Sequence, residues 1–236
     1  MSAVRFNHPL LSFLLALLLA ACATVARAEL RVPAALQLDA ATASVEAWPA
    51  VSLFSDPTRQ ASLDDVLAQR DRFAAPAAAY ATLGMGRDVV WLRLPLRLGE
   101  GTGREWILDI DYTLLNRVDV YVLADDRTLQ HAVLGNVQPF AARPLVSRSH
   151  AMPLQLADAG EVELLMRVDT GGARILPITL SRPAAFHARA VNEQMLQGLL
   201  TCLGLGLLLY SLLQWLHLRE GLYLKYAVLV MFSMLF

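Results

Sequence analysis

Residues 90–98 read VWLRLPLRL, and this stretch decides the fold. Its apolar side chains occupy alternate positions, namely Val90, Leu92, Leu94, Leu96 and Leu98. Period-two alternation is typical of a β-strand with one face on a hydrophobic core. The pattern recurs at 105–110, 117–122 and 162–168, and shorter candidates lie at 51–54, 128–134, 152–156 and 175–180. These short strands predict a mainly β protein, with an antiparallel β-sandwich of jelly-roll type followed by a transmembrane helix.

One short helix interrupts the strand pattern at residues 62–69, which read SLDDVLAQ. Ser62 can cap the helix N-terminus, because its hydroxyl can accept a hydrogen bond from a free backbone N–H group. Asp64 and Asp65 then lie in the first turn, where the helix dipole favours negative charge.

The N-terminal apolar segment is typical of an export signal. Residues 10–20 are too short for an ordinary spanning helix of ~20 residues, and Ala26-Arg-Ala28 supplies small residues for a signal peptidase. We therefore expect a signal peptide at 1–28. An alternative is the lipobox-like Leu19-Ala-Ala-Cys22, in which Cys22 would be acylated and become the N-terminus.

A second apolar segment, Met195 to Leu218, contains no Asp, Glu, Lys or Arg and is long enough to cross ~30 Å of hydrocarbon. The positive-inside rule places the cations that follow it in the cytoplasm. The expected divisions are an N-terminal linker at 29–44, a periplasmic β-sandwich at 45–187, a tether at 188–194, transmembrane helix 1 at 195–218, a cytoplasmic loop at 219–225 and a truncated second helix at 226–236. We thus expect a fragment of a bacterial inner-membrane protein, with residues 29 to about 190 in the periplasm.

Composition argues against nucleic-acid binding and against a disulfide within the sandwich. The formal net charge is −1, from 20 Lys and Arg against 21 Asp and Glu, so the chain has no basic footprint for nucleic acid. The two cysteines, Cys22 and Cys202, both lie outside the expected sandwich, which can therefore form no internal disulfide. We expect no cofactor and no metal. The expected partners are the membrane, a carbohydrate or small polar ligand, and a second copy of the chain in a homodimer.

No constellation of residues predicts catalysis. His131, His150 and His187 occur singly, without a partner at metal-ligand or triad spacing. Asp109 and Asp111 share one face of a strand and could be paired carboxylates or part of a calcium site, although solvated strand faces carry acids routinely. We therefore expect this part of the protein to be non-enzymatic.

A binding face is the more informative candidate. Odd-numbered strand positions combine aromatic and charged side chains, namely Trp91, Arg93, Asp109, Asp119, Tyr121 and Arg167. Such a mixture suits a sugar or another small polar ligand. The alternative is an ordinary solvent-exposed face, with Trp91 packed under a loop.

Small residues form a stripe along the expected transmembrane helix. Gly198, Cys202 and Gly206 recur at four-residue spacing, and Tyr210 continues the same stripe. Small side chains on one helix face allow a second helix to approach closely, although glycine is also common in membrane helices.

The order of landmarks resembles one known family. The landmarks are Asp56-Pro57, Ser62 to Asp65, Leu83-Gly84, the strand 90–94, Val118 to Tyr121, Pro139 to Pro144, Leu164 to Val168, Leu208 to Leu213 and Arg219 to Tyr226. In this order they resemble the bacterial seven-transmembrane receptors with diverse intracellular signalling modules (7TMR-DISM). The similarity covers their type 2 extracellular domain and the start of the seven-helix region, over roughly residues 45 to 236.

The resemblance implies a carbohydrate-binding-like jelly roll that senses a ligand and signals through seven helices to a cytoplasmic diguanylate cyclase or histidine kinase. It also draws notice to Trp91, Arg93, Arg143 and Pro144, although Trp91 and Arg143 could equally be structural. Two alternatives remain open, a membrane-anchored carbohydrate-binding or carbohydrate-processing protein and a structural envelope lipoprotein acylated at Cys22.

Overall fold

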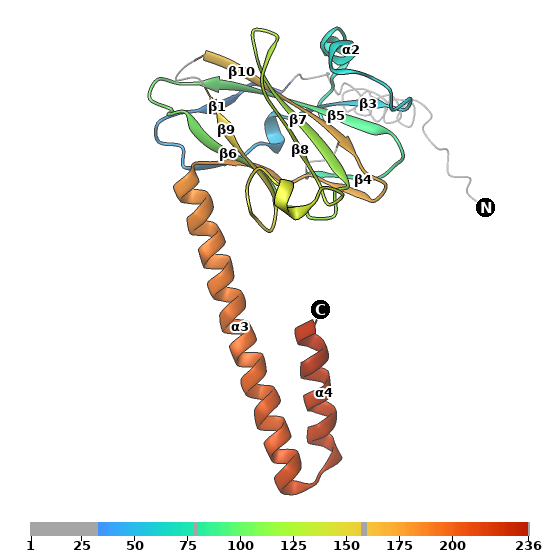
Figure 1. The fold of residues 1–236 in the computed structure, drawn as a ribbon, viewed down its shortest axis with the longest axis vertical. Coiled ribbons are helices and arrows are strands. Elements are labelled where there is room, and N and C mark those ends of the chain that lie inside the picture. The colour runs from blue at the N-terminus through green and yellow to red at the C-terminus, as the bar shows by residue number, and fades with distance from the viewer. Residues whose placement is uncertain (1–32, 78–79, 157–159, 236) are drawn as a thin grey trace, which may run out of the picture.

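The computed structural model describes residues 33–77, 80–156 and 160–235. The expected signal peptide and the lipobox with Cys22 lie outside the described residues. Figure 1 shows a β-sandwich from which one long helix leaves, followed by a shorter helix that runs back beside it. The expected fold class, a mainly β sandwich followed by an apolar helix, is confirmed.

The larger sheet has six strands in the order β1-β5-β10-β7-β8, and β3 also pairs with β5. Its strands are β1 (Leu36–Leu38), β3 (Ser52–Asp56), β5 (Val89–Leu98), β7 (Arg117–Ala124), β8 (Arg127–Leu134) and β10 (Gly160–Asp169). Every pair is antiparallel except β1 with β5, which is parallel. The deciding strand β5 is therefore an interior strand, paired with β10 along one edge and with both β1 and β3 along the other.

The smaller sheet has four strands in the order β2-β12-β6-β9, and a further pair joins β11 to β4. Its strands are β2 (Ser44–Glu46), β6 (Glu105–Ile110), β9 (His150–Gln155) and β12 (Ile178–Ser181), and the pair is β4 (Thr82–Met85) with β11 (Ala173–Ile175). Short helices lie at η1 (Trp48–Ala50), α2 (Leu63–Leu67), η2 (Arg70–Arg72) and η3 (Phe140–Ala142).

The core lies between the two sheets and uses the predicted alternating positions. All five even-numbered residues of 90–98 are buried there, together with Leu164, Val120 and Leu108 from neighbouring strands. Cross-strand pairing sets this arrangement, because Leu164 lies opposite both Leu94 and Val122. A one-residue slip would turn these side chains away from the core.

The strand prediction is wrong in detail at two places. The expected strand 175–180 is two strands, β11 and β12, which belong to different sheets and are separated at Pro177. Proline lacks the N–H group that a continuous strand would need there. The strands β1, β2 and β4 were not expected, since three or four residues are too few to show a period. Because β1 lies within 29–44, part of the expected linker belongs to the larger sheet.

A second apolar layer covers part of the outer face of the larger sheet. Trp91 and Leu165 of this face pack with Phe54, Val66 and Phe73. Val66 belongs to α2, whose start has the predicted cap. The Ser62 side chain accepts from the Asp65 backbone N–H while the Asp65 side chain accepts from the Ser62 backbone N–H.

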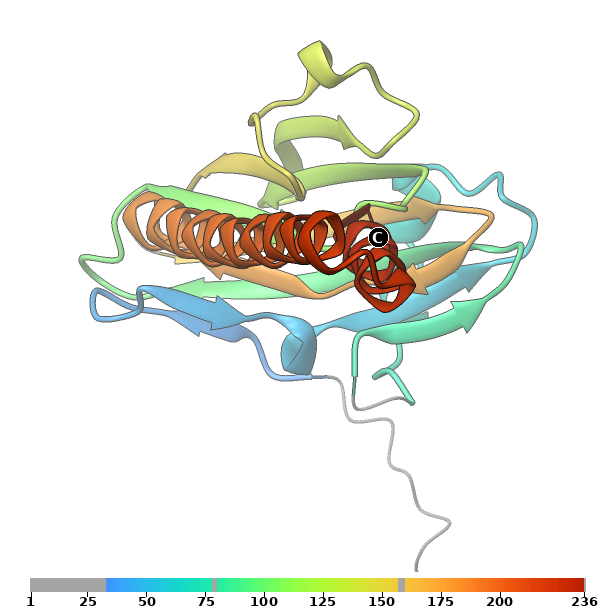
Figure 2. The same cartoon turned by 90° about the horizontal axis from the view of Figure 1, so that it is seen from below.

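The two C-terminal helices are α3 (Pro183–Leu218) and α4 (Gly221–Leu235). At 36 residues, α3 is about 54 Å long and is long and apolar enough to cross a membrane. The expected tether 188–194 is part of this continuous helix. Of the expected loop 219–225, only Arg219 and Glu220 lie between the helices, with Arg219 in the left-handed conformation that ends α3. Figure 2 shows α3 running obliquely beneath the sandwich, with α4 beside its far end.

Candidate functional site

Trp91 is not an exposed aromatic platform. Its side chain is 1% exposed, since α2 and its flanking segments cover it, and it stacks on Tyr121 with ring centroids 6.2 Å apart. Tyr121 is half-buried and stacks in turn on His131 at 4.5 Å. The expectation that Trp91 offers a binding surface is therefore wrong in this conformation, and the alternative of a covered structural tryptophan holds.

The charged residues of the expected face do lie on one sheet, but they are paired with each other. Arg93 forms an ion pair with Glu163, which Arg70 also contacts at 2.7 Å. The side chain of Asp119 is only 4% exposed and lies 2.8 Å from Arg117 and 3.6 Å from Arg167. The pairs of Arg93 with Glu163 and of Arg167 with Asp119 join neighbouring strands, and such cross-strand pairs are ordinary on an outer face. A ligand would have to displace them.

Two candidates lie apart from that face. Asp109 is on β6 of the smaller sheet, so it does not join the group on the larger sheet. Arg143 follows η3 in the loop between β8 and β9, donates to the Ser147 carbonyl at 3.0 Å and lies over the Phe140 ring at 4.8 Å. These contacts match the structural alternative for Arg143, an arginine that ties a loop to a backbone carbonyl.

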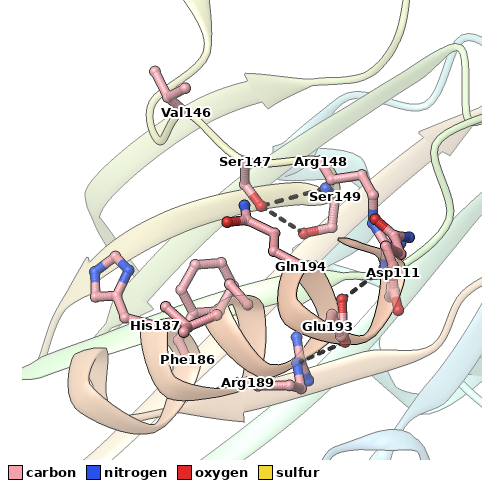
Figure 3. A pocket seen from close by; sticks show the side chains of 13 residues that line it. Asp111, Val146, Ser147, Arg148, Ser149, Phe186, His187, Arg189, Glu193 and Gln194 are labelled. Carbon is pink, nitrogen blue, oxygen red and sulfur yellow. Dashed lines mark hydrogen bonds and ion pairs between the residues drawn. The ribbon is translucent and has the colours of Figure 1, made fainter. Parts of the chain in front are cut away.

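The structure offers a different site where the sandwich meets α3 (Figure 3). A pocket of about 330 Å³ opens there between the loop before β9 and the first turns of α3. Its principal polar lining residues are Asp111, Ser147, Arg148, Ser149, His187, Arg189, Glu193, Gln194 and Gln197. We name it the junction pocket. It places hydrogen-bond donors and acceptors of both charge signs around a volume suited to a small polar molecule.

A buried ion pair fixes the wall of the junction pocket to the sandwich. The Asp109 side chain is completely buried and pairs with Arg189 of α3, whose side chain is 39% exposed. Burial raises the pKa of the Asp109 carboxyl above its ordinary value, while a Ser149 hydrogen bond and the Arg189 charge oppose that shift. One turn earlier, Phe186 packs against Ile107 and Ala151 on the same sheet face. The first turns of α3 are therefore held by apolar and ionic contacts together.

Arg148 makes a second connection across the pocket. Its guanidinium lies 2.8 Å from Glu193 of α3 and 3.7 Å from Asp111, which follows β6. All three side chains are between 40% and 57% exposed, so water screens the pair and a bound ligand could rearrange it. Asp109 and Asp111 thus each face an arginine.

The hypothesis of a calcium site at these two aspartates gains no support. Within the described ranges no group of three or more metal-ligating side chains occurs.

The expected helix-packing stripe does not face α4. A Cβ added at Gly198 or Gly206 would meet nothing within 4 Å, and Cys202 is exposed. Gly204 faces α4 instead, since a Cβ there would lie 2.8 Å from the sulfur of Met234. The stripe 198, 202 and 206 thus does not pack on α4, and its packing against another helix stays a prediction.

Sequence reasoning missed the junction pocket because its two walls are far apart in the chain. Residues 146–149 carry no periodic signal. The expected tether covers 188–194, and His187 is the last residue of the expected sandwich, so neither is expected to be helical. Arg189 and Glu193, four residues apart on one helix face, are the signal that a helical interpretation of 183–194 would have revealed.

Comparison with known proteins identifies a family. The model of the family described as 7TMR-DISM extracellular 2 matches residues 49–182. A search of curated proteins found no match.

Solved structures share only a loose likeness. An arabinoxylan arabinofuranohydrolase of glycoside hydrolase family 43 from Bacillus subtilis, in complex with cellotetraose, is 13% identical with a TM-score of 0.30. The match covers 62% of this chain and 28% of that one. A β-glucuronidase from Ruminococcus gnavus is 7% identical with a TM-score of 0.32, covering 59% and 28%. TM-scores this low do not transfer a function from these enzymes, and the match spans less than a third of each.

Proposed function

The chain belongs to the 7TMR-DISM extracellular 2 family, and from that premise we propose that it is the ligand-sensing input region of a bacterial multi-pass membrane receptor. A domain of this family is the periplasmic sensor of a membrane receptor, and here one apolar helix long enough to span a membrane follows it. The ligand is a carbohydrate or another small polar molecule. The output is a cytoplasmic diguanylate cyclase or histidine kinase outside this chain, as the family resemblance implies.

The junction pocket is the observation that carries this proposal. One of its walls belongs to the loop before β9 and the other to α3, which continues without a break from Pro183 into the charge-free segment. A ligand bound between these walls would contact the spanning helix directly. Its binding energy could then favour one helix position over another, which is what signalling across the membrane requires.

The pocket favours polar over apolar ligands. Arg148 and Arg189 supply cationic donors, while Asp111 and Glu193 accept hydrogen bonds within the same volume. Because these charges balance, the pocket suits a neutral polyol or a zwitterion better than an ion of either sign. Sugars and small polar metabolites are therefore the compounds to screen.

The test is a calorimetric binding screen on the whole chain in lipid nanodiscs. For any compound that binds, the variant Ala190→Trp fills the pocket from the α3 wall, and Ala188→Trp, outside the pocket lining, is the matched control. We expect Ala190→Trp to abolish binding and Ala188→Trp to retain it. Loss of binding in Arg167→Ala alone would place the ligand on the outer face of the larger sheet and overturn the junction site.

The two alternatives remain as outcomes of the same screen. Turnover of a sugar substrate by the purified chain would favour a membrane-anchored carbohydrate-processing protein. Absence of any bound compound, with a lipid-modified Cys22 found by mass spectrometry of the mature N-terminus, would favour a structural envelope lipoprotein.

A further inference from the structure

The loop between β8 and β9, residues 135–149, exposes large apolar side chains. Val137 is 61% exposed, Phe140 is 58% exposed and Val146 is 75% exposed. We name this segment the η3 loop. Several exposed apolar residues of this size on one short loop make it a candidate interaction surface.

One end of the η3 loop lies beside the part of α3 that becomes apolar. Val146 and Ser147 line the same pocket as Gln194 and Gln197 of α3, and these two glutamines flank Met195, the first residue of the charge-free segment. Figure 3 shows this end of the loop beside the helix. In Figure 1 the η3 loop, drawn in yellow, extends on the side of the sandwich from which α3 departs. A bilayer crossed by α3 would therefore lie next to this loop.

The chemistry of the η3 loop matches the interfacial zone of a bilayer. Aromatic side chains and arginines are favoured at that depth, where an apolar body meets hydrocarbon and a cation meets lipid phosphates. The Arg143 guanidinium lies 4.8 Å above the Phe140 ring. Arg148, further along the loop, is already paired with Glu193 at 2.8 Å. One short segment thus presents exposed apolar groups together with an arginine beside the aromatic ring.

We propose that the η3 loop is a membrane-docking surface, with Phe140 and Val146 inserted at the boundary between headgroups and acyl chains of the leaflet that α3 enters. The occupant is the lipid surface. This proposal depends on α3 crossing the bilayer and is independent of which ligand the sandwich senses. Together with α3, the docked loop holds the sandwich at two points and so defines the tilt of the domain relative to the membrane. Ligand binding in the junction pocket, between the loop and α3, would then shift the domain to a different tilt.

The test measures the depth of single spin labels on the whole chain in nanodiscs containing anionic lipid. Labels are attached at Phe140→Cys and Val146→Cys in a background in which Cys22 and Cys202 are serine. Leu129→Cys is the control, because Leu129 is 55% exposed and lies on β8, close to the β7–β8 turn at the opposite side of the sandwich.

We expect the labels at 140 and 146 to be more accessible to oxygen than the label at 129. They should also lose most of their accessibility to a water-soluble nickel complex, since polar reagents are excluded from hydrocarbon. Equal nickel accessibility at all three positions would overturn the proposal. Protection from both reagents would also overturn it, because it would indicate a contact with protein, such as a second copy of the chain.

A second variant covers the case in which a cysteine substitution disturbs the loop. Phe140→Trp keeps an aromatic ring, and lipids brominated near the headgroup should quench the added fluorescence. The parent chain has four tryptophans, and its emission is measured separately and subtracted. Unquenched emission from Trp at this position would contradict docking.

Discussion

The ion pair between Asp109 and Arg189 should determine how firmly α3 is attached to the sandwich. Replacing Arg189 by alanine leaves a completely buried carboxylate without its cation. Losing one partner of a fully buried pair costs about 3–5 kcal/mol, and the 39% exposure of Arg189 reduces the expected loss to about 2–3 kcal/mol. Asp109→Asn should lower the free energy of unfolding by less, about 1–2 kcal/mol. The asparagine amide has nearly the same shape as the carboxylate, and the Arg189 guanidinium can turn toward water.

The assay is urea unfolding of the detergent-solubilised chain, followed by the fluorescence of the buried tryptophans in the sandwich. Arg148→Ala is the matched control, since Arg148 is 57% exposed and its pair with Glu193 should contribute at most about 1 kcal/mol. The double variant Asp109→Asn with Arg189→Ala should lose less than the sum of the two single changes, because both remove the same interaction. Equal losses for Arg189→Ala and Arg148→Ala would refute the reasoning.

The pH dependence provides an independent check of that pair. Burial already raises the pKa of Asp109, so the folded state holds the proton more tightly than the unfolded state does. Removing Arg189 takes away a positive charge that opposes this rise, and the pKa should increase further. The loss of unfolding free energy caused by Arg189→Ala should therefore be largest near neutral pH. It should become smaller at acid pH, where Asp109 is protonated. A penalty that grows on acidification would contradict this assignment.

Three further predictions follow from the fold. Trp91→Ala should lower the free energy of unfolding by about 3–5 kcal/mol, as measured by urea titration, because the indole is a core residue of the second apolar layer. Burial lowers the pKa of His150, so stability should fall as pH drops below about 6.5, and His150→Leu should flatten that part of the profile in thermal melts. Gly204→Leu should lower the melting temperature of the helical hairpin in detergent, whereas Gly206→Leu should not, because only Gly204 faces α4.

Much of the sandwich could be predicted because burial of one strand face leaves a period-two signal. The even-numbered residues of 90–98 were expected in the core and are there. The odd-numbered face gave no comparable information. Trp91 and Arg93 have the same parity, yet α2 covers the first while the second stays partly exposed and pairs with Glu163. Which part of an outer face a distant segment covers cannot be seen in strand periodicity.

For the long helix, too, the sequence predicts one part and tertiary contacts decide the other. The charge-free stretch 195–218 marked the segment able to cross a membrane, and α3 contains it. The helix nevertheless begins at Pro183, because Phe186 and Arg189 find partners on the outer face of the smaller sheet. Those partners, Ile107 and Asp109, lie about eighty residues earlier in the chain, a separation consistent with tertiary packing supplying most of a helix's stability.

The sequence by itself determined the sandwich class, the inward face of its long strands, the capped helix α2 and the apolar segment that follows, since each leaves a local periodic or compositional signal. Only the tertiary structure decided that Trp91 is covered, that Arg93, Asp119 and Arg167 are paired, and that a pocket opens between the loop before β9 and α3. The physical reason is that ion pairs, coverage and pockets depend on which distant segments meet, and strand pairing brings those segments together without a sequence period.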